Sequence, residues 1–406
     1  MTKRKQKTQL IIDTAFKVWG ENSFYKTSLS SLAEAMGMTK PAIYRYFNNK
    51  EALLQAMKDD FISKYQILLI KSESSGKKTL DERITDYTEI PVRFFAENYH
   101  YYRYLVLILL NMNQDIELLF DEMRGNHENF LSPTLLQKYG FSEIESLSIS
   151  GYILSVGGFL LNQHLFTKNT YTKKEINQIL KTIRYVCRYG LAGHNQNNKQ
   201  TNYIEVERIS KINKKDVLPF NKIFTAVAEV IADKGIWNTT VDAIAEKLNM
   251  SKSSLYFYFD NKEQMIQDVI GSERDRLNEL IMERIVKFES YEEQLYCIFY
   301  VMSSYFLLKP SIFTIMNWLR YQFLNTTIKP VNHKLEKFTE YINLLTNTSS
   351  FNPIGFPAEL IAEGLSFILI HGLWECIGKN NSHTNLILRI RKIHQLLLYG
   401  LKGTKK

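Results

Sequence analysis

Apolar side chains recur at helical spacing in the stretch 29–51, and this pattern organises the rest of the chain. Between Leu29 and Met36 they fall at positions i, i+3, i+4 and i+7, which lie on one face of a helix. Gly37 follows, at a position where a helix that ends with positive φ favours Gly or Asn. A second short run of helical spacing begins after Thr39. The pattern therefore predicts two short helices joined by a tight turn.

The same pattern returns 212 residues later, in the stretch 241–263, without a gap. Eight of the fourteen positions from 38 to 51 are identical in the second copy. Asn249 replaces Gly37, which is the exchange that a positive φ allows. The pair that faces inward on the second helix is also kept, as Ile43 and Phe47 in one copy and Leu255 and Phe259 in the other.

Hydroxyl side chains stand where each short helix begins, and such side chains accept hydrogen bonds from the first backbone N–H groups of a helix. We expect Thr27 and Thr39 to cap the two helices of the first copy. Thr239, with Asp242 at the capping-box position, and Ser251 have the same expected roles in the second copy.

Helical periodicity continues on both sides of each copy, and the layout of the first half recurs in the second. Three parts of this layout are an amphipathic helix before the copy, a long helix after it, and two helices at the end of each half. The two halves end in Tyr189-Gly190-Leu191 and Tyr399-Gly400-Leu401, which are 210 residues apart. We predict an all-α fold made by tandem duplication. The predicted boundaries are 1–60 for the first helix-turn-helix domain (motif 28–47), 61–192 for a helical domain, 193–212 for a linker, 213–272 for the second helix-turn-helix domain (motif 240–259) and 273–406 for a second helical domain.

Composition agrees with long helices in a globular protein. Of the 406 residues 45% are hydrophobic, and only 8 Pro and 18 Gly interrupt the pattern. Three cysteines far apart provide neither a disulfide framework nor a metal-binding pair, so we expect a reducing, cytoplasmic setting. No apolar run is long enough to suggest a membrane span. No phosphate-binding loop, nucleophile elbow or metal-ligand spacing is present, so we expect no enzyme, no cofactor and no metal.

The formal charge of +9 is unevenly distributed. Residues 1–51 hold nine Lys/Arg and four Asp/Glu, a balance of +5, whereas residues 213–263 hold seven of each, a balance of zero. Basic charge supplies most of the sequence-independent attraction to DNA phosphates. The first copy is therefore expected to bind DNA more strongly. A neutral second copy could still bind through hydroxyl groups and helix N-termini, or could have lost DNA binding.

The run Thr-Lys-Pro-Ala-Ile-Tyr-Arg-Tyr-Phe-Asn-Asn-Lys-Glu (39–51), preceded by Ile-Asp-Thr-Ala-Phe (12–16), resembles the N-terminal domain of TetR-family transcriptional regulators. Ile-Phe-Thr-Ala (223–226) and the stretch 251–263 resemble it again. The specific part is the pattern Tyr-x-x-Phe-x-x-Lys-Glu, and the resemblance covers roughly 50 residues in each half. Family members usually carry one such domain and act as homodimers, so a chain with two departs from the family.

The resemblance implies that each second helix lies in the major groove of double-stranded DNA, with its first residues at base edges. The residues implied to face bases are Thr39, Lys40, Pro41 and Ala42, and then Ser251, Lys252, Ser253 and Ser254. Those implied to contact phosphates are Thr27, Tyr44, Tyr46 and Lys50, and then Thr239, Tyr256, Tyr258 and Lys262. For the tyrosines, packing with a solvated hydroxyl is the alternative interpretation.

The resemblance also implies a four-helix interface between subunits and a small-molecule effector in the helical domains. Here the helices at about 142–190 and 357–400 would form that interface within one chain, an intramolecular pseudo-dimer; two independent tandem domains are the alternative. The expected function is that of a ligand-responsive repressor, and the unequal base-facing sets predict that its operator has two unequal half-sites. A sensor or interaction module whose second motif no longer binds DNA is the other function considered. Candidate effector contacts are Tyr101, Tyr104 and Trp318, although aromatic residues at helical spacing also fit a plain core.

Overall fold

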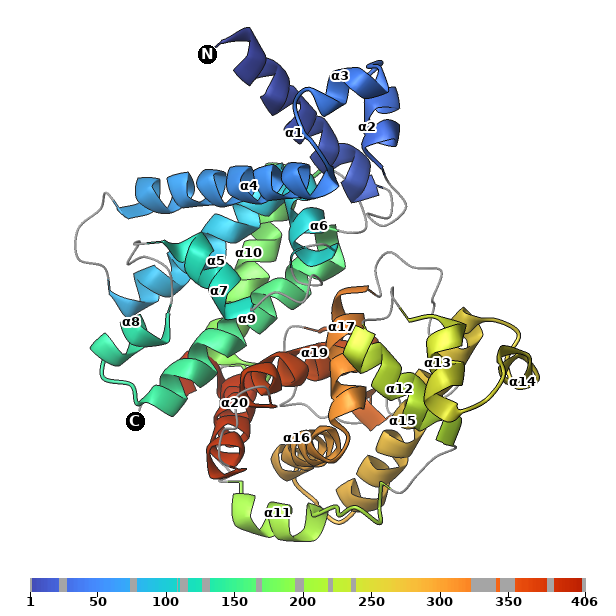
Figure 1. Cartoon of the computed structure of the whole chain (residues 1–406). Helices are drawn as coiled ribbons and strands as arrows, with labels where there is room; N and C mark the ends of the chain where they lie inside the picture. Colours follow the sequence, from blue (N-terminus) through green and yellow to red (C-terminus); the bar gives the residue numbers. More distant parts are fainter. Residues whose placement is uncertain are drawn as a thin grey trace. The chain divides into compact units, whose positions relative to one another are not determined.

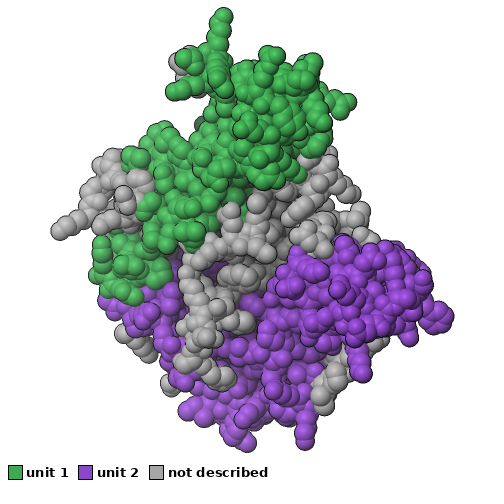
Figure 2. Space-filling view, in the orientation of Figure 1, with its two compact units in different colours: residues 1–139, 160–182 green, residues 140–159, 183–406 purple. Residues whose placement is uncertain are grey.

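In the computed structural model, every described element is an α-helix. The structure describes residues 2–21, 28–73, 79–107, 109, 116–125, 132–165, 170–193, 201–217, 222–234, 239–322, 341–343, 355–377 and 383–403. By its internal contacts the chain forms two compact units, one of residues 1–139 and 160–182 and the other of residues 140–159 and 183–406 (Figure 2).

The first repeat begins with three helices that form a small domain (Figure 1). They are α1 (Lys3–Glu21), α2 (Leu29–Ala35) and α3 (Lys40–Tyr44). The long helix α4 (Lys50–Glu73) packs against α1, and its inward residues Leu53, Met57 and Phe61 are fully buried. The further helices of this unit are α5 (Leu80–Glu97), α6 (Tyr99–Leu107), α7 (Ile116–Arg124) and α8 (Pro133–Lys138).

The second repeat uses the same helices in the same order. α12 (Lys222–Lys234), α13 (Val241–Leu248), α14 (Lys252–Tyr256), α15 (Lys262–Ile285), α16 (Tyr291–Leu308) and α17 (Pro310–Gln322) follow one another as α1 to α6 do. Packing is repeated as well, because α12 contacts α13, α15 and α17 just as α1 contacts α2, α4 and α6. The all-α tandem duplication predicted from the sequence is confirmed.

The last two helices of each repeat are α9 (Glu143–Leu165) with α10 (Lys173–Tyr189), and α19 (Ala358–Ile377) with α20 (His383–Gly403). Residues 140–159 and 183–193, from the first repeat, belong to the same compact unit as α19 and α20. Within that unit, Phe159 packs on Phe367 with ring centroids 5.7 Å apart, and Lys392 donates to Glu145 at 3.0 Å. The boundary between compact units therefore does not follow the boundary between repeats.

The ends of the two repeats cross each other backbone to backbone in this unit. Gly190 and Gly400 both have positive φ, 64° and 60°. A Cβ added to Gly190 would overlap the backbone of Leu398, and a Cβ added to Gly400 would overlap that of Arg188. The two contacts are equivalent under the 210-residue offset of the repeat ends, because position 190 corresponds to position 400 and position 188 corresponds to position 398. The backbone N–H of Leu191 also donates to the carbonyl of Leu397 at 2.7 Å.

Part of the stretch 193–212, expected to be a linker, forms a packed helix, α11 (Tyr203–Ser210). It contacts α15 and α16, and its Val206 is fully buried. The Glu207 carboxylate accepts two hydrogen bonds from the guanidinium of Arg391, both at 2.7 Å, and one from the Tyr296 hydroxyl. The sequence did not predict this helix because the stretch is short and charged. Of its three aliphatic side chains only Val206 is buried.

Among the described residues, one helix, α9, is long and apolar enough to cross a membrane by length and composition. Two thirds of its most apolar window, 67%, is buried inside the protein, as in the core helix of a globular fold. The bent pair α16 and α17, which meet at 115° before Pro310, passes the same test only when counted together.

Candidate DNA-binding site

The turn between the two short helices has the same geometry in both repeats. Gly37 has φ 61°, and Asn249 has φ 52°, the one non-glycine residue with positive φ in the described part of the chain. In the first motif the N–H of Met38 donates to the carbonyl of Ala33 at 2.8 Å. In the second motif the N–H of Met250 donates to the carbonyl of Ala245 at 2.9 Å. The conformation expected from Gly and Asn is therefore present in both motifs.

This turn provides a test with a matched pair of variants. Asn249→Gly is expected to leave the free energy of unfolding nearly unchanged, because the first repeat uses Gly at the equivalent position. Asn249→Ala should lower it by about 1 kcal/mol or more, because a left-handed conformation is strained for an alanine. Urea unfolding followed by circular dichroism measures both. Equal stability of the two variants would contradict the turn geometry.

The capping residues of the first helix in each motif lie one position later than expected. Ser28, not Thr27, caps α2: its hydroxyl accepts from the N–H of Ser31, and Ser31 completes a capping box. Thr27 lies outside the described residues. In the second motif Thr240, not Thr239, accepts from the N–H of Ala243 at 3.1 Å.

The second helices differ in their caps. Ser251 caps α14 as predicted, accepting from the N–H of Ser254 at 3.1 Å. Thr39 occupies the N-cap position of α3, but its side chain makes no capping hydrogen bond. Asp242 is not part of a capping box: its carboxylate accepts from the Lys252 ammonium group. The prediction for Asp242 was wrong because the cap shifted by one residue.

The inward-facing pairs hold each second helix in place. Ile43 and Leu255 are 0% and 1% exposed, and Phe47 and Phe259 are buried beside them. Their burial leaves the opposite face of each helix on the surface. The expected base-facing residues lie on that face: all are exposed except Ala42, which is half-buried.

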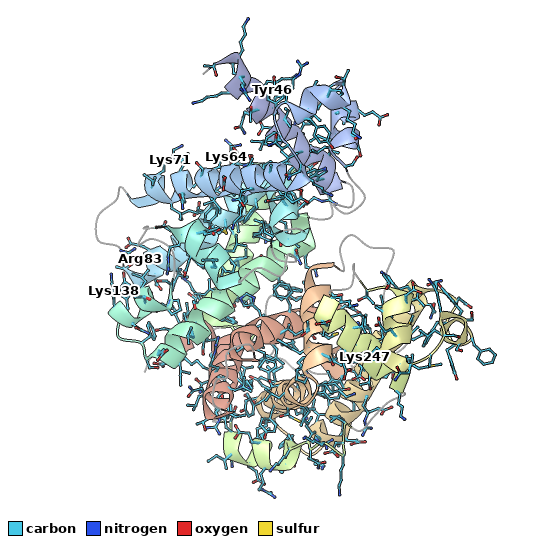
Figure 3. The ribbon with its side chains drawn as sticks, in the orientation of Figure 1. Tyr46, Lys64, Lys71, Arg83, Lys138 and Lys247 are labelled. Atoms are coloured by element: carbon cyan, nitrogen blue, oxygen red, sulfur yellow. The ribbon has the colours of Figure 1, made fainter. Side chains whose placement is uncertain are left out.

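The expected phosphate contacts are more varied. Tyr44, Tyr256 and Tyr258 are 41%, 48% and 55% exposed, whereas Tyr46, labelled in Figure 3, is half-buried. Thr239 is only 1% exposed, so its hydroxyl does not reach the surface, and the exposed Thr240 takes its place as a candidate.

The two lysines at the start of the long helices are partly buried. The Lys50 ammonium lies 5.5 Å from the ring centroid of Trp19, and burial lowers the pKa of Lys50 from its usual value. Lys262 donates to the backbone carbonyl of Thr239 at 3.0 Å. Each lysine is therefore held against the first helices of its own domain.

Charge partners distinguish the two motifs. Lys252 donates to Asp242 at 2.9 Å, and Lys247 (Figure 3) lies 2.9 Å from the carboxylate of Glu229. In the first motif the exposed cations are Lys40 and Arg45, and neither forms an ion pair with a residue that the structure describes. Arg45 was not selected from the sequence, although its place between two tyrosines puts it on the exposed face.

The candidate effector contacts Tyr101 and Tyr104 are buried in the aromatic core of their unit, 8% and 2% exposed. Both rings meet the ring of Phe16 edge to face, with centroids 4.4 and 5.0 Å away. They therefore connect α6 to α1 of the helix-turn-helix domain. Trp318 lies in α17, and its side chain is outside the described part of the structure.

Comparison with known proteins agrees with this geometry. A family model described as "Bacterial regulatory proteins, tetR family" matches the chain twice, over residues 11–57 and 223–269. The chain carries two TetR-like units. Each matched range runs from the first helix of a repeat, through both helices of the motif, into the long helix α4 or α15.

Three curated relatives contain a similar region. The chain is 36% identical over 77 residues to the uncharacterized HTH-type transcriptional regulator YuxN of Bacillus subtilis (strain 168), which covers 18% of this chain and 26% of that protein. It is 30% identical over 76 residues to the HTH-type transcriptional repressor ComR of Escherichia coli (strain K12), covering 19% and 36%.

It is also 36% identical over 62 residues to the biofilm operon icaADBC HTH-type negative transcriptional regulator IcaR of Staphylococcus aureus (strain Newman), covering 15% and 33%. The chain thus spans about a quarter to a third of the length of these relatives. The family model covers residues 11–57 and 223–269, and the helical domains lie outside these two ranges.

Proposed function

We propose that the chain is a sequence-specific transcriptional repressor that folds as the single-chain counterpart of a TetR-type homodimer and acts on DNA in the cytoplasm. One observation carries this proposal: two helix-turn-helix motifs with exposed second helices occur in a chain whose repeats cross reciprocally at Gly190 and Gly400. A homodimer with two-fold symmetry makes each of its contacts twice, once from each subunit. The two glycine contacts have this reciprocal form within one chain.

The proposed operator has two unequal half-sites, roughly one helical turn apart. Identical subunits require a palindrome, but these motifs present different side chains to the groove. The first offers Lys40, Pro41 and Ala42, whereas the second offers Lys252, Ser253 and Ser254. Lysine is suited to guanine O6 and N7, and an alanine methyl is suited to the methyl group of thymine.

A small-molecule effector is the proposed regulator. An effector changes DNA binding only if it binds one arrangement of the helix-turn-helix domain better than another. In the first unit, Tyr101 connects α6 to the helix-turn-helix domain. Its ring contacts Phe16 of α1, and its hydroxyl donates to Asp60 of α4 at 3.2 Å. Lys64 (Figure 3) donates to the same Asp60 at 2.8 Å. A ligand that displaces α6 would therefore move α1.

The second candidate function is an interaction or sensor module in which only the first motif binds DNA. It is favoured by the second motif's charge and by the ion pairs at Lys247 and Lys252. Both functions share the first motif and differ in whether the second contributes to the recognised sequence.

Selection of bound duplexes from random DNA with the full chain tests the proposal. We expect a sequence with two different half-sites and one chain per duplex, with Lys40→Ala relaxing the preference at one half and Lys252→Ala at the other. A perfect palindrome bound by two chains would contradict the single-chain pseudo-dimer. A single conserved half-site that Lys252→Ala does not affect would favour the second candidate function.

A further inference from the structure

The two motifs differ at one surface pair whose members come from different helices of the same motif. In the second motif, Asp242 lies in the first turn of α13 and Lys252 is the first residue of α14. The Lys252 ammonium donates to the Asp242 carboxylate at 2.9 Å, and both side chains are largely exposed. At the equivalent positions, 212 residues earlier, the first motif has Ser30 and Lys40.

The contrast extends to every cation of the two motifs. Residues 28–47 contain Lys40 and Arg45 against the single acid Glu34, a formal balance of +1. Residues 240–259 contain two lysines and two acids, a balance of zero. Both lysines of the second motif have acidic partners at 2.9 Å.

Lys252 is also the one cation at the start of the second helix, where a side chain reaches base edges or the flanking phosphates. We propose that Asp242 competes with DNA for Lys252, and that this intramolecular competition makes the second motif the weaker of the two DNA-binding surfaces. The inference rests on the proposed function and specifies how its two halves differ. To contact DNA, Lys252 must leave a carboxylate that remains on the DNA-facing surface and repels phosphates.

An exposed ion pair is only weakly stabilising, so the pair can open. Asp242 therefore lowers the affinity of the second motif without abolishing it. The consequence is a graded asymmetry: the first motif engages DNA over a wide range of salt concentration, and the second engages it when its half-site offers enough further contacts.

Exchanging the residues at positions 30 and 242 between the two motifs tests this inference. Binding of the full chain to a mixed-sequence duplex is measured between about 0.05 and 0.3 M KCl, and the slope of log K against log [salt] is compared among variants. Asp242→Ser gives the second motif the residue of the first, and Ser30→Asp gives the first motif the residue of the second. Asp242→Asn removes the charge while keeping the shape.

We expect Asp242→Ser and Asp242→Asn to steepen the slope by about 0.9, the value for one further phosphate contact, and to tighten binding at about 0.1 M salt by roughly eightfold. Ser30→Asp should make the slope shallower by a similar amount. Lys252→Ala added to Asp242→Ser should cancel the gain. Asp242 and Lys252 are exposed and Ser30 is half-buried, so far-UV circular dichroism checks that each variant is folded.

An unchanged slope for both Asp242 variants would overturn the inference, as would weaker binding, which would make Asp242 a group that orients Lys252 for contact. The proposed function fails by a different result: wild-type chain and Lys40→Ala would bind the duplex with the same affinity and slope.

Discussion

Replacing Gly400 with alanine is expected to lower the free energy of unfolding by about 3 kcal/mol or more. Gly400 has φ 60° and ψ −168°, a backbone region that is essentially restricted to glycine and alone costs an L-residue roughly 1–3 kcal/mol. The added methyl group would also overlap the backbone of Arg188, which a change of rotamer cannot relieve, and overpacking adds about 1–3 kcal/mol. At roughly 2–4 °C per kcal/mol, the midpoint of thermal unfolding should fall by roughly 6–12 °C.

Gly37→Ala is the matched control for this variant. Gly37 has nearly the same φ, 61°, but among the described residues no atom other than those of its chain neighbours lies within 4 Å of the position that a Cβ would take. Its replacement should cost only the conformational part, about 1–2 kcal/mol. Gly190→Ala should resemble Gly400→Ala, since its Cβ would overlap the backbone of Leu398. Equal costs for Gly37→Ala and Gly400→Ala would contradict the close crossing of the two repeats.

The same variants bear on DNA binding. Two motifs held in one chain bind cooperatively only if they can engage their half-sites together. If the crossing at Gly190 and Gly400 fixes the pseudo-dimer, Gly400→Ala should weaken binding to the full operator more than binding to either half-site alone. Gel-shift titration with whole and half operators compares the two.

Much of the fold follows from local rules and could be predicted from sequence. Positive φ at residues 37 and 249, and burial of the pairs at 43/47 and 255/259, need only helix geometry and turn chemistry. The tandem layout follows from the repeat itself. The crossing near residue 400 also has a signal in the sequence, because both repeats end in the same Tyr-Gly-Leu run.

Features that depend on a choice between adjacent groups were missed. Thr27-Ser28 and Thr239-Thr240 each offer two hydroxyls that can cap a helix, and only tertiary packing decides that Thr239 is buried and Thr240 caps. The ion pair of Asp242 and Lys252 joins two helices across the turn, at a separation that no single helical period reveals.

Helix α11 was assigned to the linker for a related reason. Its stabilising contacts are polar and distant in sequence, because Glu207 pairs with Arg391 and Tyr203 lies 3.0 Å from the ring of His394. Charged side chains in a short stretch beside a polar run indicate solvent exposure when read alone. The burial of these groups depends on α16 and α20, which come much later in the chain.

His394, in this same cluster, predicts a loss of stability in acid. Its ring is fully buried, and Nε2 lies 2.9 Å from the backbone carbonyl of Glu292, so Nε2 carries the proton and Nδ1 accepts from the hydroxyl of Tyr203. Burial lowers the pKa of His394 to about 3, whereas an unfolded histidine titrates near 6.5.

Between these two pKa values the unfolded chain binds a proton that the folded chain does not, so the free energy of unfolding falls as the pH is lowered. The stability that the neutral, buried His394 ring contributes is complete above about pH 6.5. It is lost progressively towards pH 3, at about 1.4 kcal/mol per pH unit. Between about pH 6.5 and pH 4.5 this one group should remove roughly 2.7 kcal/mol. Other titrating groups contribute as well, so the prediction concerns the difference from a variant that cannot bind this proton.

His394→Gln is that variant, because a glutamine amide can donate to the Glu292 carbonyl and accept from Tyr203 without titrating. Urea unfolding of both proteins is measured at several values between about pH 7 and pH 4.5. Wild type should be the more stable protein at neutral pH and should lose this advantage as the pH falls, by about 1.4 kcal/mol per unit below pH 6.5. Parallel stability curves would mean that the ring is protonated in the fold, and the polar cluster that joins α11 to α20 would then need a different arrangement of hydrogen bonds.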